Sequence, residues 1–413
     1  MSLTGCAPVT TTRLPAPARR DLPLLLGGAA VSTIGSSVSI LAVMVHLEDA
    51  GAVWVAASMA AELVPVVLLA PLAGRLVDRV PNRRLLLGSL LLQAVGLLLA
   101  AFVGLRPGLL GVLLVGLAMV GAGLAVTSPT ISALLPRVTG EAGATRAYGW
   151  YSVITQAGFL VGFAVSGVVV ELTSVATALL LDAASFLVMT LAVLALRTER
   201  VPEPHDDVVP SAWLGFVRIR QDALLLVAVS GIAAAILATV IVNVAEVFLI
   251  LGEIGAGPAA YGVVTAFWPA AGILGGWYAG RLIGDRALFR ALAGASVVMG
   301  IALAGAGLAP SLVGVAVAWA VGGVAGSVQR VSVNALVRSR TPDAERGRVF
   351  AAVAAVFQTG NLTGLAAGAA LVGLVGPRNS LFVSGVLTAL AGVVMWFVGR
   401  SRTGGSVLHP IGG

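Results

Sequence analysis

Long apolar stretches recur along the whole chain and limit its fold more than any other feature. Twelve stretches of roughly 20 residues are separated by short breaks that contain Arg, Gly or Pro. A helix of about 20 residues crosses the roughly 30 Å hydrocarbon core of a bilayer. We therefore expect transmembrane helices at 22–47, 53–73, 85–104, 108–135, 147–171, 175–197, 223–250, 257–281, 287–309, 311–337, 347–372 and 378–400.

The composition agrees with an all-α polytopic membrane protein. Of the 413 residues, 58% are hydrophobic and only 10% are charged, and the mean hydropathy is +1.02. A soluble domain carries about 25% charged residues, so this chain has too few to cover a surface that faces water. The apolar runs are continuous and lack the period-two alternation of membrane β-barrel strands, which excludes that fold.

All 25 basic residues are Arg. The absence of Lys excludes phosphate loops of the Walker type, Schiff-base enzymes and protein kinases, which need that side chain. If the N-terminus is cytoplasmic, every Arg except Arg106, Arg330 and Arg378 falls on the cytoplasmic side. Because cytoplasmic loops are enriched in basic residues, we expect a multi-pass protein of the cytoplasmic membrane with both termini inside. The net charge of +7 then reflects membrane topology and not nucleic-acid binding.

A membrane-embedded enzyme is possible in principle, but the sequence lacks a cluster of zinc ligands. His46, His205 and His409 lie far apart, and none opens an H-x-x-x-H pair. We therefore expect a protein that is not an enzyme, with no catalytic residue, no metal site and no cofactor.

A polar segment at 198–222 divides six expected spans from six. Its Pro and acidic residues predict a flexible or partly helical linker. The expected organisation is a cytoplasmic tail at 1–21, a six-helix bundle at 22–197, the linker, a second six-helix bundle at 223–400 and a cytoplasmic tail at 401–413.

The two halves repeat each other. A shift of about 202 residues places Arg146 on Arg348 and Gln156 on Gln358, and a shift near 206 places 74–77 on 280–283. Because six spans is an even number, the copies have the same orientation, as in the parallel repeats of alternating-access transporters. The sequence therefore predicts two pseudo-symmetric six-helix bundles.

The segment after the second span carries a family resemblance. It reads Gly-Arg-Leu-Val-Asp-Arg-Val-Pro-Asn-Arg-Arg over 74–84 and is similar to the signature loop of the major facilitator superfamily. The segments 32–35, 134–136, 181–183 and 345–348, together with Pro65, resemble the drug and siderophore exporter branch, which includes macrolide-efflux and enterobactin-exporter-like proteins. The chain departs from the superfamily's antiporters at Phe163, where they often carry Pro, and its fourth span lacks the Arg found in many proton-coupled members.

The loops after spans two and eight are candidate gates. We expect Gly74 to let helices approach closely, Asp78 to lie near Arg346 or Arg348, and Asp285 to lie near Arg146. The alternative is that the arginines only set topology. The candidate gating residues are Gly74, Asp78, Arg79, Arg83, Arg84, Gly280, Arg281, Asp285, Arg286, Arg146 and Arg348.

Four ionisable residues lie within spans: Glu62, Asp182, Glu246 and Arg330. A charge in hydrocarbon costs at least about 2.5 kcal/mol, so each should face a cavity or a partner. Glu62 and Glu246 are the leading candidates for proton coupling, whereas Asp182 also fits a structural role.

Small polar residues at helical spacing predict the wall of a central cavity. The candidates are Ser32, Ser36, Ser39, Thr127, Asn243, Gln358 and Asn361. Helix packing is the alternative for the small ones, and for the glycines of spans five and eleven packing is the expected role. For the Trp268-Pro269 pair, a cavity wall and a helix kink both stay open.

The resemblance and the scarcity of fixed charges predict a secondary transporter that works by alternating access. The expected activity is efflux of a small apolar or amphipathic compound, such as a drug, a natural product or a siderophore-like molecule, driven by the proton gradient. Such a protein would bind a small-molecule substrate and the lipid bilayer and would function as a monomer. An uptake carrier or facilitator for a neutral metabolite is the alternative within transport. A non-transporting membrane receptor or scaffold is the alternative from another class.

Overall fold

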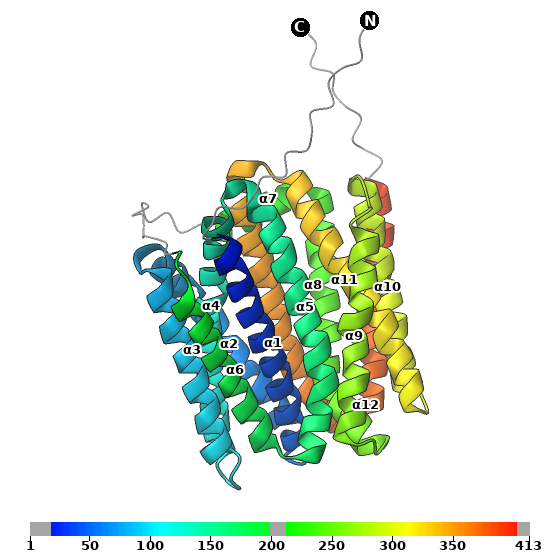
Figure 1. The fold of residues 1–413 in the computed structure, drawn as a ribbon. Helices are drawn as coiled ribbons and strands as arrows, with labels where there is room; N and C mark the ends of the chain where they lie inside the picture. Colours follow the sequence, from blue (N-terminus) through cyan, green and yellow to red (C-terminus); the bar gives the residue numbers. More distant parts are fainter. Residues whose placement is uncertain (1–17, 199–211, 403–413) are drawn as a thin grey trace, which may run out of the picture.

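The computed structural model describes residues 18–198 and 212–402, and every regular element in these ranges is helical. The outer parts of the expected tails, at 1–17 and 403–413, and the 199–211 part of the expected linker lie outside the described residues. Figure 1 shows long helices whose axes are roughly parallel to one another, with the short α7 at one end.

The first half contains six long helices. They are α1 (Ala18–Glu48), α2 (Ala52–Arg79), α3 (Asn82–Leu99), α4 (Leu110–Thr139), α5 (Glu141–Leu172) and α6 (Val175–Ala195). A π-helical turn, η1 (Ala100–Gly104), continues α3. Most of these helices exceed the expected spans by about a turn, because polar residues next to each apolar run continue the helix into the interface.

The second half repeats this arrangement. It comprises α8 (Ala223–Val247) with the π-helical turn η2 (Phe248–Glu253), α9 (Pro258–Ala279), α10 (Asp285–Leu308), α11 (Leu312–Arg340) and α12 (Asp343–Arg402). The α12 element contains two spans, because Gly376 has a non-helical backbone with φ 80° and ψ 169° and Pro377 follows it. Counting these two separately, the described chain has the twelve expected transmembrane helices.

Glycines allow equivalent helix pairs to pack closely in the two halves. A Cβ built on Gly162 of α5 would lie 2.5 Å from the Ser37 side chain of α1, and one on Gly364 of α12 would lie 2.7 Å from the Leu237 carbonyl of α8. These contacts confirm the packing role expected of the glycines in spans five and eleven. Because the pairs α1–α5 and α8–α12 correspond in the repeat, they also support the pseudo-symmetry.

The segment between the halves ends in the amphipathic helix α7 (Ala212–Gln221). Ile219 is buried, and a Cβ on Gly215 would clash with the Arg348 carbonyl of α12. Arg218 adds an ion pair of 3.0 Å with Glu345. The helix is therefore attached to the second half.

Candidate functional site

A cavity of about 660 Å³, which we call the central cavity, lies between the two halves. Helices α1, α2 and α5 contribute to its wall from the first half, and α8, α9, α11 and α12 from the second. Most of the wall is aliphatic or aromatic. Its polar members include Asn243, Gln358 and Asn361, which the sequence had singled out as cavity candidates. The Asn361 amide donates a hydrogen bond of 3.0 Å to the Gln358 side chain.

Glu246 marks one end of the central cavity. It is 8% exposed, and its carboxylate accepts hydrogen bonds from the Tyr261 hydroxyl at 3.1 Å and the Trp319 indole at 2.9 Å. Tyr261 and Trp319 are buried on α9 and α11. Glu246 is in the last turn of α8, directly before the π-helical turn η2, a local geometry that is frequent at functional sites.

The sequence interpretation missed Tyr261 and Trp319. The signal that could have found them is the carboxylate itself, because a buried carboxylate needs donors and apolar spans offer few besides Tyr and Trp. The structure also places Trp268 and Pro269 in the cavity wall, with the Trp268 ring edge-on to Trp319 at 6.4 Å between centroids.

A second cavity, of about 200 Å³, lies within the first half, and we call it the inner cavity. Glu62 lines it together with Ser32, Ser36 and Thr127. Within the described ranges, the Glu62 carboxylate makes no hydrogen bond or ion pair. The cavity candidates are therefore divided between two cavities, which share Ile40 in their walls.

Asp182 and Ser39 line neither of these two cavities. Asp182 is 1% exposed on α6 and accepts hydrogen bonds from Ser36, Ser39 and Ser185. Gly35 of α1 faces the same group. A Cβ there would lie 2.4 Å from the Ser185 side chain and 2.7 Å from the Asp182 side chain, so a larger residue would force one of the neighbours to shift. This geometry joins α1 to α6.

The gating candidates lie at one end of the molecule, which we call the arginine-rich end. Arg83 donates a hydrogen bond of 2.7 Å to the Leu194 carbonyl, and the Arg281 guanidinium stacks 3.2 Å from the Trp277 ring centre. A Cβ on Gly74 would meet no atom within 4 Å, so the expected close helix approach there is wrong in this conformation. The expected contact of Asp78 with the start of span eleven stays a prediction.

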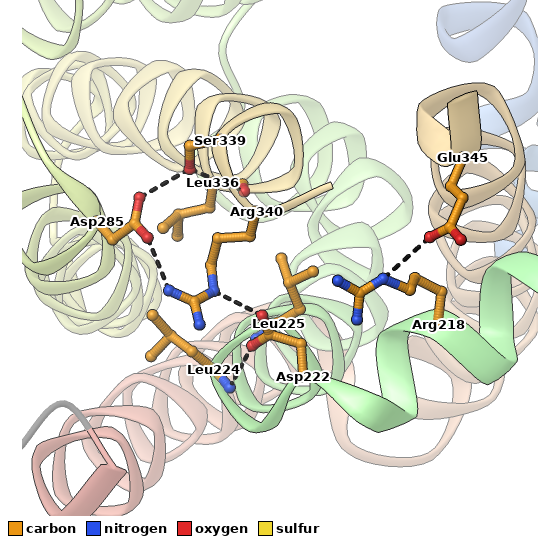
Figure 2. A network of polar contacts seen from close by, with 9 residues as sticks. All are labelled: Arg218, Asp222, Leu224, Leu225, Asp285, Leu336, Ser339, Arg340 and Glu345. Atoms are coloured by element: carbon orange, nitrogen blue, oxygen red, sulfur yellow. Dashed lines mark hydrogen bonds and ion pairs between the residues drawn. The ribbon is translucent and has the colours of Figure 1, made fainter. Parts of the chain in front are cut away.

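Asp285 has different partners from the one expected. Figure 2 shows its carboxylate bound by Arg340, at 2.7 Å, and by the Ser339 hydroxyl, both on α11, whereas the repeat predicted Arg146 on α5. Arg340 also binds Asp222 at 2.8 Å. The network joins helices of the second half with one another, because the end of α11 meets the starts of α8 and α10.

Asp222 lies just before the α8 span and caps that helix by accepting hydrogen bonds from the backbone amides of Leu224 and Leu225. Burial alone would raise its pKa, but the bonds from Arg340 and the two amides, together with the Arg340 charge, lower the pKa below its ordinary value.

At the end opposite the arginines, the two halves contact each other directly. The Glu171 carboxylate of α5 accepts a hydrogen bond of 3.0 Å from the Ala259 amide at the start of α9. Nearby, a Cβ on Gly262 of α9 would lie 2.5 Å from the Phe163 carbonyl of α5. The Tyr261 hydroxyl also lies 3.2 Å from the Met44 sulfur of α1. These contacts close that end next to Glu246.

Comparison with known proteins gives a family match over nearly the whole chain. The family model described as Major Facilitator Superfamily matches residues 24–305 and 230–411. A search of curated proteins returned no match.

Solved structures share the fold at low sequence identity. A transporter of the POT family in complex with 5-aminolevulinic acid is 11% identical, with a TM-score of 0.73 over 93% of this chain and 97% of that one. The nucleoside transporter NupG is 13% identical, with a TM-score of 0.72 over 92% and 99%. A bacterial homologue of the iron transporter ferroportin in the inward-facing state is 15% identical, with a TM-score of 0.70 over 92% and 98%.

Proposed function

The chain belongs to the Major Facilitator Superfamily, and from this premise we propose that it moves a small molecule across the membrane by alternating access. The observation that carries the proposal is the central cavity, which both halves build and which their contacts close at one end. Relative rocking of the two halves would open that end and expose the cavity to the other side. Because one chain forms the whole cavity, we propose that the monomer is the transporting unit.

We propose that the arginine-rich end faces the cytoplasm, since basic residues favour that side. The conformation is then closed to the outside, with Glu246 near the closed end. The proposed direction is export across the cytoplasmic membrane, as the resemblance to the drug and siderophore exporter branch implies. The mostly apolar and aromatic wall supports an amphipathic cargo.

We propose that protons drive the export and that Glu62 and Glu246 carry them. Each carboxylate lines a cavity inside the membrane, where a change of protonation alters the cost of burial. Tyr261 connects Glu246 to the contacts that close the outer end, because its hydroxyl lies next to both the Glu246 carboxylate and the Met44 sulfur. Protonation of Glu246 would weaken the two bonds it accepts and so favour opening.

Uptake of a panel of fluorescent drugs and dyes into inside-out vesicles, with and without an imposed proton gradient, tests this function. We expect gradient-dependent uptake in the parent protein and its loss in Glu62→Gln and Glu246→Gln. The matched control is Glu253→Gln, which removes a carboxylate that pairs with Arg378 outside both cavities.

Each alternative predicts a different result. Dye equilibration that does not depend on the proton gradient would identify a facilitator. Dye accumulation in the reverse direction would identify an uptake carrier. A protein that binds compounds in the panel but moves none would be a receptor or scaffold.

A further inference from the structure

Arg330 is a charged side chain in the wall of the central cavity, and it has no partner in the described part of the chain. It lies on α11, is exposed and belongs to the cavity wall. Within residues 18–198 and 212–402, its guanidinium makes no hydrogen bond or ion pair. The guanidinium has five N–H donors, and a basic group at this depth is costly to keep in a membrane.

Glu246, the other charged residue described in this wall, does not neutralise Arg330. Glu246 is bonded to Trp319, which precedes Arg330 by eleven positions on α11. At 1.5 Å per residue, the two positions are about 16 Å apart along the helix axis. Glu246 also already accepts bonds from two buried donors. The Glu246 carboxylate at the closed end of the cavity therefore already has hydrogen-bond donors. The Arg330 guanidinium, nearer the arginine-rich end, has no acceptor in the described chain.

The wall of the central cavity is suited to an apolar body. Trp268, Phe357 and Val333 belong to it, with the amide of Gln358 among them. A guanidinium binds a planar carboxylate through two parallel hydrogen bonds. Because Arg330 is the one cationic residue described in this wall, it can balance a single negative charge.

We infer that the cargo is an amphipathic monoanion, with one carboxylate or similar acidic group bound by Arg330 and an apolar or aromatic body packed toward Trp268 and Trp319. The inference rests on the proposed function, since it takes the central cavity as the cargo site. It excludes permanently cationic drugs as the preferred cargo. In this account Arg330 determines specificity for the charge of the cargo.

A matched set of probes tests the sign of the preferred charge. The probes are 2-naphthylacetate, its methyl ester and 2-(2-naphthyl)ethylamine, which share one aromatic body and differ in charge. Isothermal titration calorimetry on the purified protein gives the affinity of each for the parent, for Arg330→Gln and for Arg330→Lys. The control is Arg338→Gln, an exposed arginine two turns farther along α11 and outside the cavity wall.

We expect the carboxylate to bind the parent at least about tenfold more tightly than the ester or the amine, as a charge-assisted pair of bonds predicts. Arg330→Gln should remove that preference, Arg330→Lys should keep part of it, and Arg338→Gln should leave it unchanged.

The inference would be overturned if the carboxylate bound the parent no better than the ester and the amine. It would also be overturned if none of the three probes bound. A preference that survives in Arg330→Gln would overturn it too, since the anion would then bind elsewhere. Neither result would affect the gradient-dependent dye uptake in vesicles, so the two proposals fail separately. An Arg330→Gln protein that keeps the melting temperature of the parent ensures that a lost preference is not a lost fold.

Discussion

The central cavity and the inner cavity differ although the helices around them are related by a repeat. Glu246 in the central cavity is held by Tyr261 and Trp319, whereas Glu62 in the inner cavity has no hydrogen-bond partner in the described chain. The central cavity has about three times the volume and is built by both halves. The two carboxylates therefore differ in their polar partners although the halves share one backbone arrangement. We interpret the central cavity as the place for cargo and the inner cavity as a place for a proton.

The packing shared by the halves should give the largest effects. Gly162→Leu and Gly364→Leu would each force a side chain into a neighbouring helix, and we expect a loss of about 3 kcal/mol or more in both, the upper end of what overpacking costs. The melting temperature of the purified variants measures this. Gly149→Leu and Gly347→Leu are the controls, because a Cβ at either position meets no atom within 4 Å. A large loss in one half alone would contradict equivalent packing.

Removal of a hydrogen-bond donor to Glu246 should have the next largest effect on stability. Glu62 has no such donor in the described chain. Tyr261→Phe and Trp319→Phe each remove one hydrogen bond to a charged group, for an expected loss of about 1.5–3 kcal/mol. We expect lower melting temperatures and a changed pH dependence of dye uptake. The control is Tyr278→Phe, which alters an exposed tyrosine on the same helix. Equal effects of Tyr261→Phe and Tyr278→Phe would show that the Glu246 site contributes nothing specific.

Two side-chain hydrogen bonds, at corresponding places in the two halves, allow the functions of the two cavities to be distinguished. The Gln93 amide binds Thr127 at 3.0 Å beside the inner cavity, and the Gln329 amide binds Ser296 at 2.8 Å beside the central cavity. Thr127→Val and Ser296→Ala should each cost about 1 kcal/mol in stability. Only Ser296→Ala should weaken dye binding, measured by titration, since it frees a glutamine in the cargo wall. A larger binding defect in Thr127→Val would reverse our assignment.

The smallest effect should come from the network at the arginine-rich end. Because the folded-state pKa of Asp222 is lowered, Asp222 contributes fully to the free energy of unfolding at a pH above the ordinary Asp pKa. This contribution is lost as the pH falls through the lowered pKa. Arg340→Gln should cost about 1 kcal/mol or less near neutral pH, since Arg340 is partly exposed. The difference in melting temperature between parent and variant should shrink on acidification. A difference that grows in acid would contradict this account.

Much of the fold was predictable because hydrocarbon imposes a simple pattern on sequence. The twelve spans and the repeat follow from apolar length and matching residues, and the arginines give an orientation that stays a prediction. Asn243, Gln358 and Asn361 were found because polar residues are rare in such spans. The Tyr261 and Trp319 donors were missed, since aromatic residues are ordinary in apolar runs and their contacts join helices far apart in sequence. The Asp285–Arg340 pair was missed because the repeat suggested a contact between halves.

The location of the cargo is the central claim, and cysteine protection tests it most directly. In a Cys6→Ser background, which removes the one native cysteine, Asn361→Cys labels the central cavity and Ser32→Cys labels the inner cavity. The rate of modification by a small thiol reagent is measured with and without a transported dye. Our account predicts that the dye slows modification at position 361 and leaves position 32 unchanged. Protection at position 32 alone would contradict it.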